Sequence, residues 1–226
     1  MKLKTIIDCL KLIFKESKEK TFCWFLNEKE PEKITCEKLI LKSFDYVHTY
    51  KKLGCKPGDL VFIMLKHTPH LFYSFVGALL YGAIPSILAF PSEKQDPLRF
   101  WTSHRKLFEH SGGRVLITYK ENLKNIQEHF SNGLRIKILT PEEIEVKEKP
   151  GSFPLISPQS TAFLQYSSGT TGLKKGVMLT HETVMEQVKS YGKTLGLNEN
   201  SIIASWLPLY HDMGLLACFI TPMLFI

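Results

Sequence analysis

The sequence predicts an α/β fold with a largely parallel sheet and flanking helices. Apolar strand-like runs alternate with helical patterns along the chain, which is typical of this fold class. Hydrophobic residues make up 44% and charged residues 23% of the 226 residues, so the chain can bury the core of one large globular domain. No segment repeats at a fixed period, which disfavours a solenoid or a propeller.

The first 35 residues predict a helix and a hairpin. Four apolar residues recur at helical spacing among lysines and favour a core-facing helix: Ile6, Leu10, Ile13 and Phe14. The segment lacks the unbroken apolar stretch and the small-residue cleavage site of a signal peptide. Two short runs, 21–26 and 33–35, flank a charged stretch that contains a proline, and we expect them to pair as a hairpin.

The middle of the chain predicts the parallel sheet. One helix places Leu39, Phe44, Val47 and Tyr50 on a single face and ends near Gly54, before the turn at 55–59. The elements expected next are a strand at 60–65, a helix at 69–81, a strand at 84–88, a helix at 97–110, a strand at 114–118, a helix at 121–130 and a strand at 135–139. The first three of these form a right-handed βαβ unit. The charged, proline-containing stretch 141–158 predicts a surface connection and is the candidate for an internal boundary.

Charge and cysteine content narrow the class of protein. The five cysteines stand far apart, without a CxxC pair or zinc-ligand spacing, so we expect a reduced cytoplasmic protein with no metal site of this type. The net charge of +7 suits a polyanionic ligand, but the lysines are spread along the chain, as on a solvated surface. A basic nucleic-acid-binding domain stays an alternative; it predicts steep salt dependence of binding, and the absence of aromatic-basic interleaving argues against it.

The apolar run Met213–Ile226 predicts a buried helix. It is shorter than the ~20 residues that span a bilayer. It also contains Pro222. We therefore expect no membrane span here.

The segment 161–184, TAFLQYSSGTTGLKKGVMLTHETV, carries the most chemistry. Its loop combines four hydroxyl side chains, three glycines and two lysines, a composition that suits a triphosphate. It is not a Walker A motif, because the residue five places after Gly169 is Lys174 rather than glycine. Apolar 177–179 follows at once, so we expect the loop to join two strands and to bind phosphate with its own amides. Thr180 then caps a helix at 181–195, with Glu182 in its first turn.

Two motifs carry a family resemblance. SSGTTGLKKG at 167–176 resembles the phosphate-binding loop of the adenylate-forming superfamily, which includes acyl-CoA synthetases, fatty acyl-AMP ligases, luciferases and peptide-synthetase adenylation domains, and GVMLTH at 176–181 continues the match. WLPLYHDMGL at 206–215 resembles the next motif of the family, in the variant that looks most like fatty acyl-AMP ligases. The turn at 55–59 and the segments 61–65 and 77–85 are similar to the amino-terminal subdomain. One departure is Lys174, where the family usually has proline.

The resemblance implies ATP-dependent activation of a carboxylic acid, here a medium- to long-chain fatty acid, to an acyl-adenylate. It makes the protein an acyl-AMP ligase or, with coenzyme A or an acyl carrier protein as acceptor, an acid-thiol ligase. Lys175 and His211 are the implied catalytic residues: Lys175 holds the β- and γ-phosphates, and His211 orients the carboxylate near the α-phosphate. The implied ATP-binding residues are Ser167, Ser168, Gly169, Thr170, Thr171, Gly172, Lys175 and Gly176. Mg²⁺ would be required, but no carboxylate of this chain stands out as its ligand.

Each of these residues also has a structural interpretation. A loop rich in glycine, serine and threonine can be a surface turn, and His211 can be a surface histidine. Asp212 is as well placed to cap a helix that begins near Met213 as to act in catalysis. We expect Trp206 and Tyr210 to pack, and Lys174 to lie in solvent. The other seven histidines show no ligand spacing and receive no role: His48, His67, His70, His104, His110, His129 and His181.

The resemblance further implies that residues 1–226 are the amino-terminal part of an AMP-binding domain. The family's adenine- and ribose-binding motifs, its acidic residue near magnesium and its carboxy-terminal lid with a second lysine have no counterpart in this sequence. We therefore expect the isolated chain to bind ATP weakly, to catalyse no ATP–pyrophosphate exchange and to self-associate through uncovered apolar surface. A non-catalytic nucleotide-binding fragment, or one half of a split enzyme, shares the same motifs.

Overall fold

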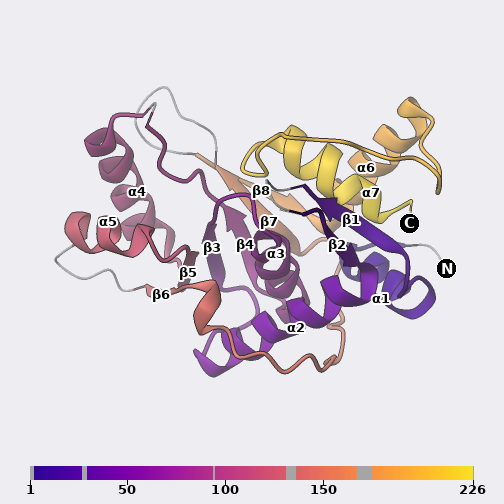
Figure 1. The fold of residues 1–226 in the computed structure, drawn as a ribbon, viewed down its shortest axis with the longest axis horizontal. Coiled ribbons are helices and arrows are strands. Elements are labelled where there is room, and N and C mark those ends of the chain that lie inside the picture. Colours follow the sequence, from indigo (N-terminus) through magenta and orange to yellow (C-terminus); the bar gives the residue numbers. More distant parts are fainter. Residues whose placement is uncertain (1–2, 27–29, 94, 131–135, 167–174, 226) are drawn as a thin grey trace.

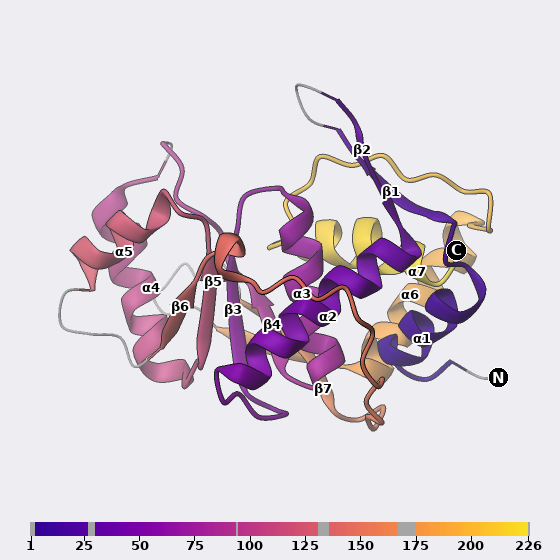
Figure 2. The same ribbon diagram turned by 60° about the horizontal axis from the view of Figure 1, so that its bottom comes forward.

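The computed structural model describes residues 3–26, 30–93, 95–130, 136–166 and 175–225. A four-stranded parallel sheet forms its centre (Figures 1 and 2). Its strand order is β4 (Ile84–Ile87), β3 (Leu60–Met64), β5 (Val115–Thr118) and β6 (Lys137–Leu139), and every neighbouring pair is parallel. The predicted α/β class with a largely parallel sheet is therefore confirmed.

Helices cover both faces of this sheet. Val61 and Ile63 of β3 belong to one buried cluster, which also holds residues of α2 (Cys36–Lys52) and α3 (Pro69–Tyr81). Phe62 and Met64 belong to the other cluster, together with residues of α4 (Pro97–Ser111) and α5 (Asn122–His129). Successive side chains of a strand point to opposite faces, so a strand covered on both sides reads as the continuous apolar run seen here.

The amino-terminal elements pack beside the larger cluster. Helix α1 (Ile6–Glu16) buries Ile6, Leu10 and Ile13, and a reciprocal capping box between Thr5 and Asp8 starts it. Strand β1 (Thr21–Phe25) pairs with β2 (Glu32–Thr35) in the predicted antiparallel hairpin. Both predictions are confirmed, and all helices and strands predicted between residues 21 and 195 are found within two residues of their expected ends.

A second, two-stranded sheet carries the predicted loop. Strands β7 (Thr161–Tyr166) and β8 (Gly176–Thr180) are antiparallel, and β7 lies beside β4 at the edge of the main sheet. Helix α6 (His181–Leu195) follows β8 directly, and the Thr180 hydroxyl accepts a hydrogen bond from the amide of Thr183 over 3.1 Å, which confirms the predicted cap. In Figure 1, α6 and α7 (Thr221–Met223) lie at the end of the molecule opposite α4 and α5.

The described part of the apolar run, 213–225, is helical and mostly buried, but the type of helix differs from the prediction. Residues Met213–Ile220 form a π-helix, η2, and the α-helical part that follows is only α7. The hydroxyl and amide of Thr221 both bond the carbonyl of Leu216, five residues earlier, at the end of the π-helix. Among the described residues, no helix is both long and apolar enough to cross a membrane.

Candidate functional site

The two strands that carry the predicted phosphate loop bring its ends together. Tyr166, the last residue of β7, pairs with Gly176, the first residue of β8. The expected strand–loop–strand arrangement is thereby confirmed. Six of the predicted ATP-binding residues, and Lys174, lie outside the described residues: Ser167, Ser168, Gly169, Thr170, Thr171 and Gly172. Lys175 and Gly176 are described and both are exposed; Gly176 is the first residue of β8, and Lys175 directly precedes it.

Gly176 packs closely against the paired strand. A Cβ atom at this position would lie 2.9 Å from Cε1 of Tyr166. Any larger residue would push the Tyr166 ring away or separate the two strands at the base of the loop. Glycine at 176 thus has a packing reason in addition to the backbone–phosphate contact that the sequence predicts for it.

The segment before η2 places His211 near the same pair of strands. The side-chain amide of Gln165 on β7 donates a hydrogen bond from Nε2 to the backbone carbonyl of Tyr210 over 3.5 Å. The amide of His211 donates to the carbonyl of Pro208 over 3.1 Å, and its own carbonyl accepts from Leu215 over 2.9 Å. The imidazole of His211 is exposed. The structure therefore brings the segment that contains His211 next to β7, the strand that leads into the first motif.

Three residues near His211 were given structural predictions: Asp212 as a helix cap, and Tyr210 and Trp206 as packing residues. Asp212 Oδ1 accepts a hydrogen bond from the amide of Met213 over 2.8 Å, so the predicted cap is confirmed. Tyr210 is half-buried, and its ring centroid lies 6.3 Å from that of Phe90, as expected for packing. The packing prediction for Trp206 is wrong, because its side chain is 87% exposed. The chain reaches the core only at Leu209, so nothing in the described part of the protein covers the indole.

Gly214 is a positioning residue that the sequence analysis missed. A Cβ atom here would lie 2.4 Å from the carbonyl oxygen of Pro208, a backbone atom that cannot turn aside. Only glycine allows the first turn of η2 to press against the segment that carries His211. The glycine is visible in the sequence as part of the YHDMG string. Its close contact with Pro208 can be recognised only in the three-dimensional structure.

His181 links the strand that leaves the loop to the amino-terminal helix. The side chain is 1% exposed, and its Nδ1 accepts a hydrogen bond from the amide of Ile6 over 3.3 Å. Burial lowers the pKa of His181 to about 4, and the carboxylate of Asp8 opposes this shift. The sequence analysis assigned no role to this histidine. The structure gives it a structural role, because its neutral imidazole accepts a hydrogen bond from the amide at the start of α1.

We expect His181 to make stability depend on pH between about 4 and 6.5. The unfolded chain takes up a proton near pH 6.5. The folded chain does so only near pH 4. The contribution of the neutral His181 to the free energy of unfolding is therefore complete above pH 6.5 and is lost as the pH falls toward 4. The loss is on the order of 3 kcal/mol. Urea unfolding of the protein and of His181→Asn at pH 7 and pH 4.5 measures this, since asparagine can accept the same hydrogen bond without titrating. Equal losses of stability in the two proteins would contradict the prediction.

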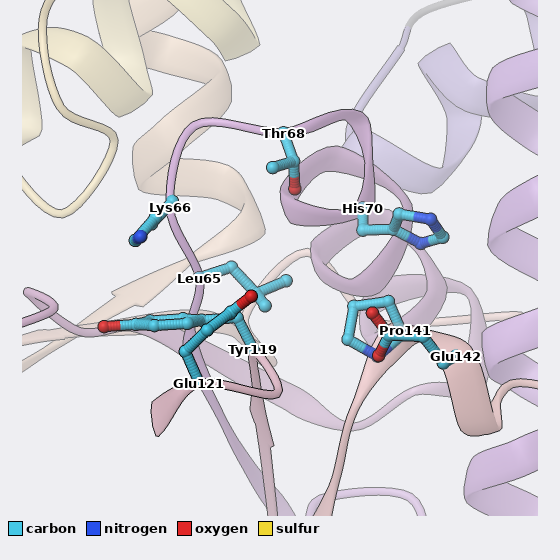
Figure 3. A pocket seen from close by; sticks show the side chains of 8 residues that line it. All are labelled: Leu65, Lys66, Thr68, His70, Tyr119, Glu121, Pro141 and Glu142. Carbon is cyan, nitrogen blue, oxygen red and sulfur yellow. The ribbon is translucent and has the colours of Figure 1, made fainter. Parts of the chain in front are cut away.

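A pocket of about 340 Å³ opens at the carboxyl ends of the parallel strands (Figure 3). Its lining comes from the loop after β3, the start of α3, the loop after β5 and the 3₁₀ turn η1 (Pro141–Glu143): Leu65, Lys66, Thr68, His70, Tyr119, Glu121, Pro141 and Glu142. The lining has two carboxylates and one ammonium group, which disfavours a polyphosphate. None of the predicted site residues lines this pocket. The pocket is nevertheless close to the segment that leads to His211, because Nε2 of His67, which lies between the lining residues Lys66 and Thr68 in sequence, is 3.1 Å from the carbonyl oxygen of Leu207.

Two of the side chains that line the pocket, Lys66 and His70, already have partners. The ammonium of Lys66 lies 4.9 Å from the centroid of the Tyr119 ring, in cation–π geometry. Nδ1 of His70 lies 2.9 Å from the hydroxyl of Tyr46, and burial lowers the pKa of His70. The sequence analysis expected no role for His70 in ligand binding, and this stays a prediction.

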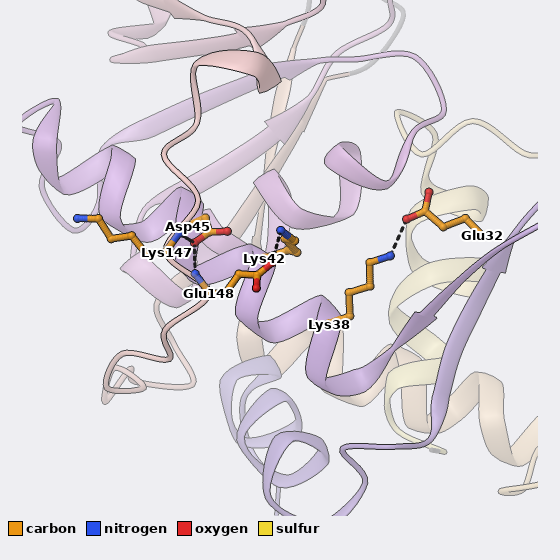
Figure 4. A network of polar contacts seen from close by, with 6 residues as sticks. All are labelled: Glu32, Lys38, Lys42, Asp45, Lys147 and Glu148. Atoms are coloured by element: carbon orange, nitrogen blue, oxygen red, sulfur yellow. Dashed lines mark hydrogen bonds and ion pairs between the residues drawn. The ribbon is translucent and has the colours of Figure 1, made fainter.

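The connection from the parallel sheet to β7 is anchored on α2 (Figure 4). Oδ1 of the buried Asp45 accepts hydrogen bonds from the amides of Lys147 and Glu148, over 2.8 and 2.9 Å. The ammonium of Lys42 also bonds the carboxylate of Glu148 over 2.6 Å. These contacts give the mostly exposed stretch 141–158 a defined path over the surface, as predicted. Whether it marks a domain boundary stays a prediction.

Within the described ranges, no group of three or more His, Cys, Asp and Glu side chains is placed to hold a metal ion. All five cysteines are free thiols. Burial raises the pKa of Cys9 and Cys23 to about 12, so these thiols stay protonated at neutral pH.

Known proteins resemble this chain over nearly its whole length. The AMP-binding enzyme family matches residues 14–225. The 4-coumarate–CoA ligase 3 of Arabidopsis thaliana is 33% identical over 186 residues, which are 73% of this chain and 31% of the ligase. The medium-chain-fatty-acid–acyl-carrier-protein ligase TtuA of Teredinibacter turnerae is 27% identical over 210 residues, which are 75% of this chain and 32% of that ligase.

A solved structure agrees with the fold. The fatty acyl-adenylate ligase of L. pneumophila, in complex with acyl adenylate and pyrophosphate, superimposes with a TM-score of 0.84 at 28% identity. The match covers 98% of this chain and 38% of that chain. The chain therefore spans about a third of the length of the relatives that it matches.

Proposed function

Because the chain belongs to the AMP-binding enzyme family, we propose that it forms the phosphate-loop part of an enzyme that activates a carboxylic acid with ATP. The observation that carries this proposal is the pairing of Tyr166 with Gly176, which closes the base of the loop and places Lys175 at its rim. The hydrogen bond from Gln165 to Tyr210 ties the His211 segment to the same strand. These contacts support the proposal that the two motifs act at one site.

The proposed reaction is attack of a substrate carboxylate oxygen on the α-phosphorus of ATP. The bond from the α-phosphorus to the oxygen that bridges to the β-phosphate breaks, and pyrophosphate leaves with that electron pair. Such a substitution needs mainly positioning and neutralisation of charge. Lys175 and the loop amides would hold the β- and γ-phosphates, the loop hydroxyls would add hydrogen bonds, and His211 would orient the carboxylate.

Mg²⁺ would accompany the nucleotide, as it does with ATP in general. The described residues do not fit a metal centre, since no group of three acidic, histidine or cysteine side chains converges there. The proposal therefore routes no step through a metal ion held by this chain.

The proposed substrate class is a medium- to long-chain fatty acid. Support comes from the YHDMGL string, from the apolar stretch 214–226 and from similarity to two ligases that are named for fatty acids or fatty acyl groups. An aromatic acid is the second candidate, because a 4-coumarate–CoA ligase is 33% identical to this chain. Coenzyme A or an acyl carrier protein would be the acceptor of a second step, and the proposed location is the cytoplasm.

We expect ATP–pyrophosphate exchange to be fastest with a fatty acid. The assay uses this chain joined to the rest of an adenylate-forming domain, and compares dodecanoate, acetate, 4-coumarate and a panel of amino acids. A long apolar chain buries about 0.8 kcal/mol of favourable transfer free energy per CH₂ group, so dodecanoate should exceed acetate clearly. Preference for an amino acid would refute the substrate proposal, and preference for 4-coumarate would select the second candidate. Robust exchange by the isolated 226-residue monomer would refute the expectation that this part alone is inactive.

A further inference from the structure

We propose that His67 is a positioning residue, whose imidazole holds the backbone of the segment that carries His211. The inference rests on the proposed function, in which His211 orients the substrate carboxylate, and extends it to a residue that the sequence analysis left without a role. It is carried by the hydrogen bond between Nε2 of His67 and the carbonyl oxygen of Leu207, over 3.1 Å. Because a carbonyl oxygen only accepts, Nε2 carries the proton and donates it.

The segment that leads to His211 runs through solvent before it reaches the core. Residues 201–206 are exposed, apart from the half-buried Ile203. Leu209 is the first residue after this stretch that is buried. The bond from His67 thus meets the chain at Leu207, where it turns from the surface toward the core. Only three residues separate this anchor from His211, so it restrains the backbone that places the imidazole of His211.

A second side chain anchors the same segment from the other side. Nε2 of Gln165 on β7 donates to the carbonyl of Tyr210 over 3.5 Å. Between the two anchored carbonyls, the amide of His211 donates to the carbonyl of Pro208 over 3.1 Å and closes a turn. One anchor comes from the loop after β3 and the other from β7. A turn that is held on both sides cannot rotate as a unit, so loss of either anchor should loosen it.

The imidazole of His67 is itself held by the amino-terminal hairpin. Its ring centroid lies 6.1 Å from that of Phe25 on β1. The Phe25 ring contacts Phe72 of α3, with centroids 5.3 Å apart, and Phe72 stacks on Phe219 of η2 at 4.4 Å. This row of rings connects His67 to the helix that begins just after His211. A donor that is already held in place loses less freedom when it bonds, which makes it an effective anchor.

Hydrogen exchange of the full 226-residue protein tests whether His67 restrains the segment. His67→Ala should speed exchange of the amides of His211 and Leu215 about fivefold, the effect of one lost hydrogen bond of ordinary strength. His67→Gln should return exchange to within about twofold of the parent, because the side-chain amide of glutamine can donate to the same carbonyl. His110→Ala is the matched control. Nδ1 of the exposed His110 also contacts a backbone carbonyl, that of Lys106 over 2.8 Å, but on α4, at the end of the molecule opposite α6.

Kinetics of the proposed reaction separate positioning from a purely structural role. With this chain joined to the rest of an adenylate-forming domain, His67→Ala should lower kcat of ATP–pyrophosphate exchange about tenfold, since a misplacement of about 1 Å can cost about a hundredfold. The KM for ATP should change less than about twofold, because the proposed phosphate loop binds the nucleotide. His67→Gln should recover most of kcat, and His110→Ala should leave both constants unchanged. The side chain of His67 is exposed, so we expect every variant to fold like the parent, which circular dichroism checks.

Three results would overturn the proposal. They are equal hydrogen exchange in His67→Ala and the parent, failure of His67→Gln to restore what His67→Ala loses, and an unchanged kcat in His67→Ala despite faster hydrogen exchange. Absence of ATP–pyrophosphate exchange in the parent would instead refute the proposed function. Hydrogen exchange would then still decide whether His67 holds the segment of His211, because it requires no ATP chemistry.

Discussion

Replacing Lys175 with alanine is expected to reduce ATP–pyrophosphate exchange by about two to three orders of magnitude. Lys175 directly precedes β8, next to the predicted loop, and its side chain is exposed. In the proposed reaction its ammonium offsets charge on the β- and γ-phosphates while pyrophosphate leaves. Loss of a charged group aimed at the developing charge raises the barrier by several kcal/mol, which corresponds to this change in rate.

The measurement is exchange at saturating dodecanoate, with this chain joined to the rest of an adenylate-forming domain. Lys174→Ala is the matched control, because the neighbouring lysine has the same charge and we expect it to lie in solvent. Its exchange rate should stay within about threefold of the parent, since an exposed charge contributes little. Circular dichroism of both variants should equal that of the parent. Equal rates for Lys175→Ala and the parent, or equal losses in the two variants, would remove Lys175 from the proposed site.

The second large effect is expected on stability, from Gly77→Ala in α3. A Cβ atom at Gly77 would lie 2.6 Å from Cβ of Tyr46 and 2.7 Å from the carbonyl oxygen of Ser43, both on α2. The two helices are also joined by a hydrogen bond from the hydroxyl of Tyr50 to the carbonyl of Ser74 over 3.0 Å. Overpacking against backbone costs about 3 kcal/mol, and the better helix propensity of alanine offsets about 1 kcal/mol of it. We expect a net loss of about 2 kcal/mol.

Urea unfolding of the parent and of Gly77→Ala at neutral pH measures this loss. The sign of the change is decisive, because helix propensity alone would make the variant about 1 kcal/mol more stable. A stabilised or unchanged variant would therefore show that α2 moves away without cost and that the close helix contact is not required.

Local patterns predicted most of the fold. The alternation of apolar runs and helical spacing placed the strands of the parallel sheet, because a strand buried on both faces is apolar at every position. The caps were equally local: Thr180 and Asp212 bond amides one to three residues away. The strand–loop–strand form of the site followed from Val177–Leu179 directly after the polar loop. These features depend on interactions between residues that are close in the sequence, so they can be predicted from the sequence.

Other features of the site depend on segments that are distant in sequence. Trp206 was expected to pack, yet it is exposed, because whether an indole is covered depends on which segments pass over it. The hydrogen bond between His181 and Ile6 joins residues 175 positions apart, and no spacing rule connects them. The π-helical form of Met213–Ile220 also escaped prediction, since its apolar composition suits any buried helix.

By itself, the sequence determined the α/β class, the order and limits of the elements, and the two motifs that carry the proposed chemistry. The tertiary structure alone decided the strand order β4-β3-β5-β6, the contact of Gly214 with Pro208, and the exposure of Trp206. The physical reason is range: periodicity and capping act over a few residues, whereas strand neighbours, close contacts and exposure arise only when distant parts of the chain pack together.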